Sequence, residues 1–296
     1  MGIMDRLQGR SGGKIQVYVE PREAGPGTAM SLRLVVVDGL DDKARAVVAG
    51  VTCTGRYLVE ERDRDSNDNI VTREVWRDVQ VYEHGQSAEL RTGEQVVKIF
   101  LPDHVQPTSS DIVTWEAWGR IDREHGIDVI ERVPFEVRVP IDRVPATRQA
   151  DGTDDGLTLS GIPTAVAEGE TVQGRLVIDV PDEVKARSVA VRLHRRVTFL
   201  AQAINDYDVY SGSLTMSFFY SDVSRITKDE QVAEVVLGGK AEFQPGRRQE
   251  IPFAIQVPRS GPTSSHPFAQ VDWRLEAVLD RRLRDDKSVE TPLIVV

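Results

Sequence analysis

The first half of the chain contains an acidic stretch whose side chains recur at the spacing of a twelve-residue calcium-binding loop. Oxygen-bearing side chains stand at its positions 1, 3, 5, 7 and 12, namely Asp63, Asp65, Asn67, Asn69 and Glu74. Position 6 carries Asp68, although the sharp turn there favours glycine, and the flanking residues alternate as strands do. We therefore expect a solvated hairpin tip with weak or no calcium binding. A calcium-regulated binding module is an alternative.

Histidine, serine and cysteine residues show no second pattern that indicates catalysis. None of the five histidines has a partner at metal-ligand spacing; they are His84, His104, His125, His194 and His266. Ser109, Ser110 and Asp111 lack a Gly-x-Ser-x-Gly elbow, and the Thr-Ser-Ser sequence recurs at 263–265, which favours a structural turn. The single cysteine, Cys53, lies on the apolar side of an alternating segment, so we expect a buried thiol. We predict no catalytic residue, no metal site and no cofactor.

The second half contains the richest aromatic cluster, formed by Tyr207, Tyr210, Phe218, Phe219 and Tyr220. In an extended strand Phe218 and Tyr220 share one face and Phe219 lies on the other. One interpretation is a core face and a face that meets the neighbouring domain; the other is an exposed patch for a partner. We predict a partner-binding region with Tyr207, Tyr210, Ser217 and Phe219, in which an exposed strand edge takes up an extended peptide.

Composition narrows the class of protein. The 296 residues suffice for two domains, and 40% hydrophobic with 28% charged residues indicates a globular, soluble chain. A formal charge of −10 argues against nucleic acid as a partner. No segment is apolar enough for a membrane span or a signal peptide, so we expect a cytoplasmic location. We expect protein partners, and a homo-oligomer is possible.

One stretch of the sequence occurs twice. Trp115 and Trp273 lie 273 − 115 = 158 positions apart, and the same offset relates Asp122 to Asp280 and Asp128 to Asp286. Three landmarks at one offset indicate an internal duplication. Both tryptophans fall on alternating strands, so we expect both to be buried at equivalent positions of two copies of one domain.

Hydrophobic alternation with period two covers both halves, and no segment shows a sustained helical period. The stretch 83–90 could hold one helical turn. A linker rich in Pro, Gly and Asp spans 140–156, which predicts domains at 1–145 and 150–296. Short alternating strands separated by turns are typical of antiparallel sandwiches. The predicted fold is all-β, with two tandem antiparallel immunoglobulin-like β-sandwiches.

The repeated segments resemble the arrestin family. Phe100, Pro102, Pro107 and Ser109 precede the first Trp-bearing strand, and Ile251-Pro-Phe253 with Val257-Pro258 precedes the second. The sequence also resembles bacterial sporulation-control proteins of arrestin-like architecture. The resemblance implies a non-enzymatic adaptor or scaffold that binds proteins through sandwich edges and concave faces, with a role in the control of sporulation or cell development. An alternative is a sandwich-based enzyme or carbohydrate-binding protein with a site on loops 61–70 or 103–111.

Overall fold

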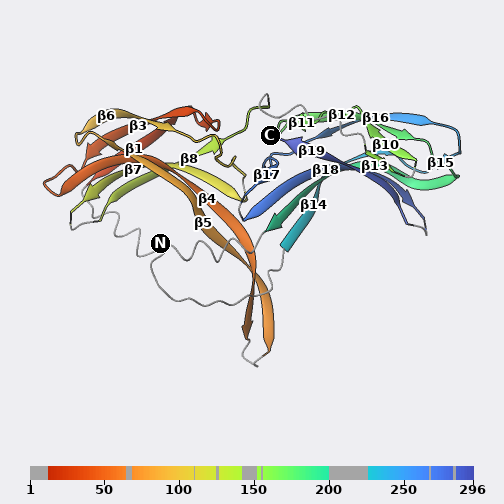
Figure 1. Ribbon diagram of the computed structural model, residues 1–296, viewed down its shortest axis with the longest axis horizontal. Helices are drawn as coiled ribbons and strands as arrows, with labels where there is room; N and C mark the ends of the chain where they lie inside the picture. The colour runs from red at the N-terminus through yellow and green to blue at the C-terminus, as the bar shows by residue number, and fades with distance from the viewer. Residues whose placement is uncertain are drawn as a thin grey trace. The chain divides into compact units, whose positions relative to one another are not determined.

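The computed structural model describes residues 13–64, 69–109, 111–124, 127–141, 152–154, 156–199, 226–266, 268–282 and 285–296. In this part of the chain the regular secondary structure consists of β-strands (Figure 1). The predicted all-β class is confirmed. The described residues contain no helix with the length and apolar character needed to cross a membrane.

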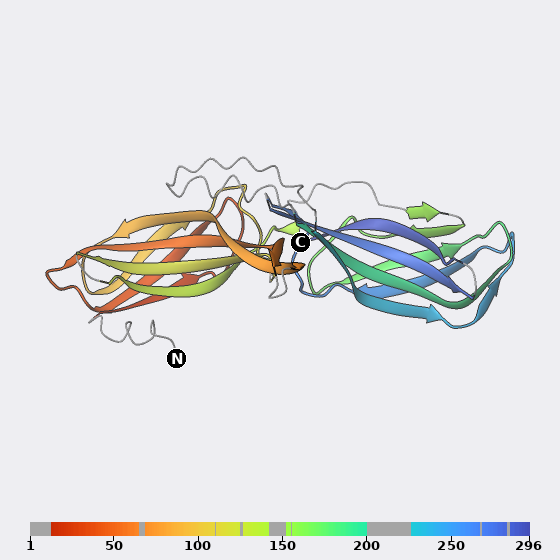
Figure 2. The same cartoon turned by 90° about the horizontal axis from the view of Figure 1, so that it is seen from below.

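The chain forms two compact units, which are described separately. The first comprises residues up to 56 and 77–139; the second comprises 57–76 and 140–296. The segment 57–76 is the end of a long hairpin, so this piece of the first half of the sequence belongs to the second unit. Figure 2 shows the strands from below.

Two antiparallel-dominated sheets build the first unit. A three-stranded sheet has the order β1-β3-β6, and a five-stranded sheet has the order β2-β8-β7-β4-β5. Their bounds are β1 (Lys14–Glu20), β2 (Glu23–Ala24), β3 (Ala29–Asp38), β4 (Ala44–Arg64), β5 (Ile70–Ala88), β6 (Gly93–Phe100), β7 (Val113–Arg123) and β8 (Val129–Val137).

The core of the first unit lies between these sheets. Alternate residues of β3 point inward, and Met30, Leu32 and Leu34 are at most 1% exposed. Gly119 of β7 faces side chains of β1 so closely that a Cβ atom would overlap Val17. Period-two alternation therefore sorts apolar side chains onto one face of each sheet, as a two-layer β structure requires.

The second unit repeats this strand order. A four-stranded sheet runs β16-β12-β10-β9, and the main path of a seven-stranded sheet runs β11-β19-β18-β13-β14, with β15 paired to β13 and β17 to β18. The strands are β9 (Gly152–Asp154), β10 (Leu157–Ser160), β11 (Ala165–Val166), β12 (Thr171–Ile178), β13 (Val184–Phe199), β14 (Ile226–Gly238), β15 (Ala241–Phe243), β16 (Gln249–Gln256), β17 (Ser264–Ser265), β18 (Ala269–Arg281) and β19 (Lys287–Val295).

One local expectation is wrong. The stretch 83–90 contains no helical turn, because β5 continues as a strand to Ala88. Gly50 and Gly85 make room for the Trp118 ring: a Cβ at either position would overlap it. The glycines let β4 and β5 stay extended beneath a large side chain, which no local pattern in 83–90 reveals.

Candidate functional site

The duplicated motif has the same local structure in both copies. Trp115 of β7 is 1% exposed and Trp273 of β18 is 2% exposed, which confirms the predicted burial. The Trp115 indole N–H donates to the Gln106 carbonyl oxygen at 2.8 Å, and the Trp273 N–H donates to Gly261 at 3.1 Å. Each ring therefore ties its strand to the loop that precedes it, satisfying its only donor inside the core.

The acidic residues of the motif close the turn after each Trp-bearing strand. The Asp128 carboxylate accepts a hydrogen bond from the Arg123 N–H at 3.1 Å, and Asp286 accepts one from Arg281 at 2.9 Å. A side-chain oxygen that caps a backbone donor fixes such turns. The shared spacing in the sequence thus reflects equivalent structural positions in two similar units.

The acidic stretch lies at the end of the β4–β5 hairpin, flanked by strands. The side chains of Asp63, Asp65 and Asn67 lie outside the described residues. Glu74 is described, and both of its carboxylate oxygens accept hydrogen bonds from the Lys228 ammonium, at 2.7 and 2.6 Å. The side chain at the last ligand position of the calcium pattern is therefore neutralised by a lysine. Where side chains are described, no three His, Cys, Asp or Glu residues come together as metal ligands.

Aromatic contacts join the segment 57–76 of the β4–β5 hairpin to the other strands and loops of the second unit. The Trp76 ring of β5 meets Phe199 of β13 edge to face, with centroids 5.4 Å apart. Tyr57 of β4 lies 6.2 Å from Phe268. Edge-to-face and tilted pairs at such distances are favourable beyond the area they bury.

A network of ion pairs covers the solvent-facing side of β14, β13, β18 and β19. We call it the ionic belt; it comprises Arg192, His194, Arg196, Asp229, Glu234, Arg274, Glu276 and Glu290. Register explains it: Arg192 stands opposite Glu276 on one side and Glu234 on the other, and Arg274 stands beside His194. Because side chains alternate between faces, these residues share the face opposite the Trp273 core.

Asp229 is the centre of the ionic belt. It accepts hydrogen bonds from Arg196 at 2.8 Å and from Arg274 at 2.9 Å, and His194 Nδ1 lies 3.8 Å from its other oxygen. Partial burial opposes the charged form of Asp229, but the two guanidinium groups outweigh it and keep its pKa below the ordinary value.

Glu276 and Glu290 extend the belt to either side. Glu276 lies 3.0 Å from His194 Nε2 and 4.0 Å from Arg192, while Arg274 also reaches Glu290 at 3.0 Å. Arg192 donates to Glu234 at 2.9 Å, which raises the pKa of this guanidinium. Charges of both signs are thus paired across four strands, an arrangement suited to holding the strands in register and to meeting a mixed-charge protein surface.

Sequence reasoning did not single out this belt. The signal was present: Arg192, His194 and Arg196 stand at every second position of one strand, and Asp272, Arg274 and Glu276 alternate with apolar residues on another. Their meeting required the antiparallel pairing of β13 with β18 at a specific register, which alternation alone does not give.

Other predicted candidates are placed as follows. Cys53 is 1% exposed, and burial raises the pKa of its thiol to about 12, which leaves it unreactive at neutral pH. Ser109 is buried and its hydroxyl donates to Asp111 at 3.0 Å, within a turn. His104 is exposed. The residues predicted to bind partners, Tyr207, Tyr210, Ser217 and Phe219, lie outside the described residues, as do Ser110 and His125.

A buried histidine follows the second Thr-Ser-Ser sequence, where Ser264–Ser265 form the short strand β17 instead of the expected turn. His266 is 3% exposed, stacks on Phe268 with centroids 5.4 Å apart, and its Nε2 lies 2.9 Å from the Ser264 hydroxyl oxygen. Among the described residues its Nδ1 has no hydrogen-bond partner, and burial lowers its pKa to about 4. In a Ser–His–Asp triad a third group holds the imidazole through this nitrogen, and the described residues supply no such group to His266.

Comparison with known families supports the resemblance. The family model described as "Arrestin (or S-antigen), N-terminal domain" matches residues 163–296. The match runs from just before β11 to the end of the chain and so covers most of the second unit. It supports an arrestin-like family for this part of the chain, and such domains suggest a protein-interaction role. No curated protein matches the sequence significantly.

Proposed function

We propose that the protein is a non-enzymatic adaptor of arrestin-like architecture, built from two tandem immunoglobulin-like sandwiches that bind partner proteins. The observation that carries the proposal is the arrestin match at residues 163–296, together with the 158-residue offset that extends its strand pattern to the first half. Families of this kind are generally scaffolds without catalytic activity.

Equivalent backbone contacts support the tandem arrangement. The Val137 N–H donates to the Thr108 hydroxyl at 2.8 Å, and the Val295 N–H donates to Thr263 at 2.9 Å. In parallel pairing, Ala24 stands opposite Val137 and Val166 opposite Val295. The donors Val137 and Val295 again differ by 295 − 137 = 158 residues, whereas the acceptors differ by 263 − 108 = 155, so equivalent hydrogen bonds form although the loops before the strands differ in length.

The ionic belt is the surface that fits an adaptor best. The strand register places its charged side chains side by side, and several of them contact more than one opposite charge. A binding protein that presents opposite charges could therefore replace individual ion pairs without exposing buried apolar groups. As the resemblance to sporulation-control proteins implies, we further propose a cytoplasmic role in sporulation or cell development.

Affinity capture followed by reconstitution with purified components tests the adaptor function. The tagged full-length chain should retain a stoichiometric protein partner, and the purified partner should bind directly. Asp229→Ala leaves Arg196 and Arg274 without their shared carboxylate and should weaken that binding, whereas Glu242→Ala, an exposed carboxylate on β15, serves as a control. Failure to find any direct partner in cells that express the protein would contradict the proposal.

The aromatic segment gives a second test of where a partner lies. If an extended peptide pairs with the strand predicted at 214–220, Ser217→Pro removes a backbone donor and weakens binding in a folded variant. Unchanged affinity would place the partner elsewhere, and the ionic belt would then be the first surface to examine.

A further inference from the structure

Strand β6 forms an unpaired edge of the three-stranded sheet. Among the strands that the structure describes, it pairs only with β3, and the Leu101 N–H donates to the Thr28 carbonyl at 2.9 Å in the same register. Hydrogen-bonded pairs alternate along an antiparallel ladder, so odd-numbered residues of β6 bond to β3. The N–H and C=O groups of Glu94, Val96 and Lys98 therefore point away from β3, on the side where no described strand pairs with β6.

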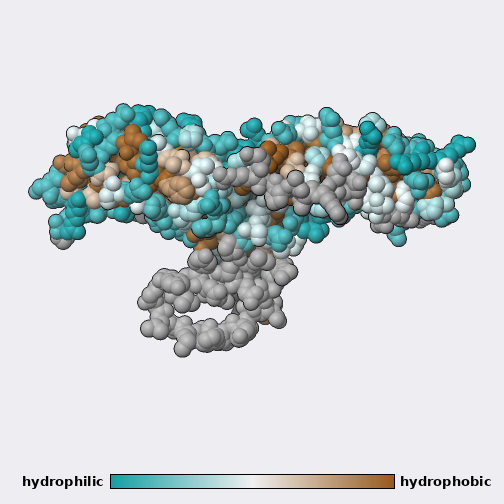
Figure 3. All heavy atoms as spheres, turned by 45° about the horizontal axis from the view of Figure 1, so that its top comes forward, coloured by the Kyte–Doolittle hydropathy of each residue, from teal (hydrophilic) through white to brown (hydrophobic). Residues whose placement is uncertain are grey.

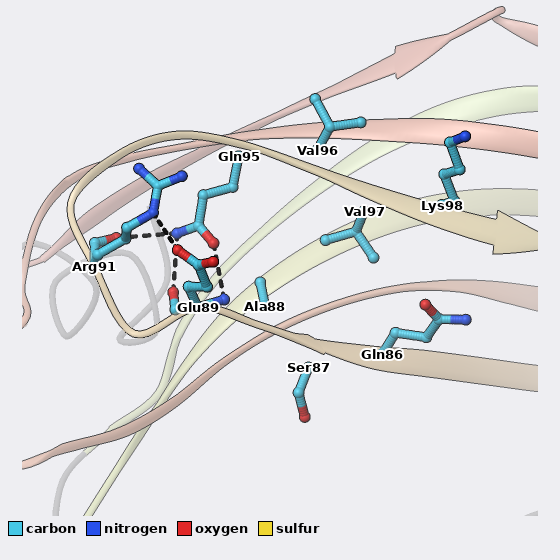
Figure 4. A pocket seen from close by; sticks show the side chains of 9 residues that line it. All are labelled: Gln86, Ser87, Ala88, Glu89, Arg91, Gln95, Val96, Val97 and Lys98. Carbon is cyan, nitrogen blue, oxygen red and sulfur yellow. Dashed lines mark hydrogen bonds and ion pairs between the residues drawn. The ribbon is translucent and has the colours of Figure 1, made fainter.

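A hollow of about 290 Å³ lies beside this edge (Figure 4). One wall is formed by Val96–Lys98 of β6. The other is formed by Gln86–Ala88 at the end of β5, a strand of the other sheet. The space gives the unpaired backbone groups room to accept another strand.

The end of the hollow is held rigidly by Gln95. Its carboxamide accepts a hydrogen bond from the Glu89 N–H at 2.9 Å and donates to the Glu89 and Arg91 carbonyls at 2.9 and 3.1 Å. Gly93, with φ of 97°, turns the chain into β6. The edge is thus preorganised, which lowers the entropy cost of adding a strand.

The side chains on the outer face of β6 fit a second copy of the same strand. Val96 is 60% exposed, and Figure 3 shows hydrophobic residues among hydrophilic ones on the side that includes β3 and β6. Lys98 has no ion-pair partner among the described residues, and the link of Glu94 to Arg33 is long, at 3.5 Å. Antiparallel pairing of two β6 strands centred on Val96 would set each Lys98 opposite the other copy's Glu94.

We propose that two copies of the protein associate through β6, with Val96 opposite Val96 and Glu94 opposite Lys98 in both directions. The interface is isologous, so each charge pair occurs twice. It turns two three-stranded sheets into one six-stranded sheet and satisfies the outward backbone groups of both edges. Because the contact is a single strand pair, the dimer is reversible and salt-sensitive. This inference goes beyond the adaptor function and does not depend on it.

Sedimentation equilibrium of the full chain over a concentration series tests the interface by charge exchange. Lys98→Glu creates two Glu–Glu contacts and Glu94→Lys creates two Lys–Lys contacts, so each single variant should raise the dimer dissociation constant at least about tenfold. The double variant Glu94→Lys/Lys98→Glu restores opposite charges and should recover the wild-type constant. This recovery distinguishes pairing from a general effect of surface charge.

A matched control uses the opposite edge of the same sheet. Lys14 of β1 is exposed, and Lys14→Glu should leave the dissociation constant unchanged. Circular dichroism verifies folding of all variants. A wild-type chain that stays monomeric throughout the series, a double variant no better than the singles, or a loss of dimer with Lys14→Glu would each overturn the proposal.

Discussion

Acidification should destabilise the second unit through His266. The pKa of His266 in the folded protein is about 4, against an ordinary value of 6.5, because burial opposes the charged imidazolium. The unfolded chain therefore binds a proton between pH 6.5 and 4 that the folded chain excludes. Stability from this group is fully present above pH 6.5 and is lost as the pH falls through this window, at about 1.4 kcal/mol per pH unit.

The size of the effect follows from the two pKa values. At pH 5 the unfolded imidazole is nearly all protonated and the folded one nearly all neutral, so the free energy of unfolding is about 2 kcal/mol lower than at pH 7.5. His266→Phe removes the titrating group while keeping an aromatic ring against Phe268. The substitution also changes the free energy of unfolding by an amount that does not depend on pH, for example through the lost contact with Ser264. This amount cancels when the difference between variant and wild type at one pH is compared with the difference at the other.

Urea unfolding followed by tryptophan fluorescence measures this difference. Between pH 7.5 and pH 5 the free energy of unfolding of the wild type should fall by about 2 kcal/mol relative to that of His266→Phe. His104→Phe, which replaces an exposed histidine, is the matched control variant. An equal gap at both pH values would show that burial does not exclude the proton, and would refute the reasoning.

Three further predictions concern packing and metal binding. Trp273→Ala should lower the free energy of unfolding by about 3–5 kcal/mol in urea titrations, and the half-exposed Trp76→Ala by less. Gly50→Ala should destabilise by about 1–3 kcal/mol, because its Cβ would overlap the His84 carbonyl and the Trp118 ring; Gly238→Ala, where no atom lies within 4 Å, is the thermal-denaturation control. Calcium titration calorimetry should show weak or no binding, and a micromolar constant that is lost in Asp65→Ala would contradict this.

Hydrophobic alternation and the internal repeat predicted which side chains of a strand point into the core. Trp115 and Trp273 are buried as expected, since each lies on the apolar side of a period-two strand. The membership of residues 57–76 in the second unit was not predictable in this way. It depends on long-range contacts such as Trp76 with Phe199, and hydrophobic alternation carries no information about which distant strand a side chain meets.

The candidate surfaces likewise include features that the local sequence predicts and features that it does not. Burial of Cys53 follows from its neighbours in sequence. The ionic belt depends on the register of β13 against β18, and the open edge at β6 depends on β5 and β6 belonging to different sheets. Register and sheet assignment are set by the whole core, so a single residue's context does not determine them.

Comparison of the two copies shows where their surfaces differ. Positions related by the 158-residue offset keep apolar residues on the core face: Trp115 matches Trp273, and Ile121 matches Leu279. On the opposite face Trp118 corresponds to Glu276, so one copy covers its sheet with an indole lying over two glycines where the other has the ionic belt. A duplicated core constrains only the inner face, because packing there tolerates few substitutions. The outer faces are free to diverge, so the two units carry chemically different outer surfaces.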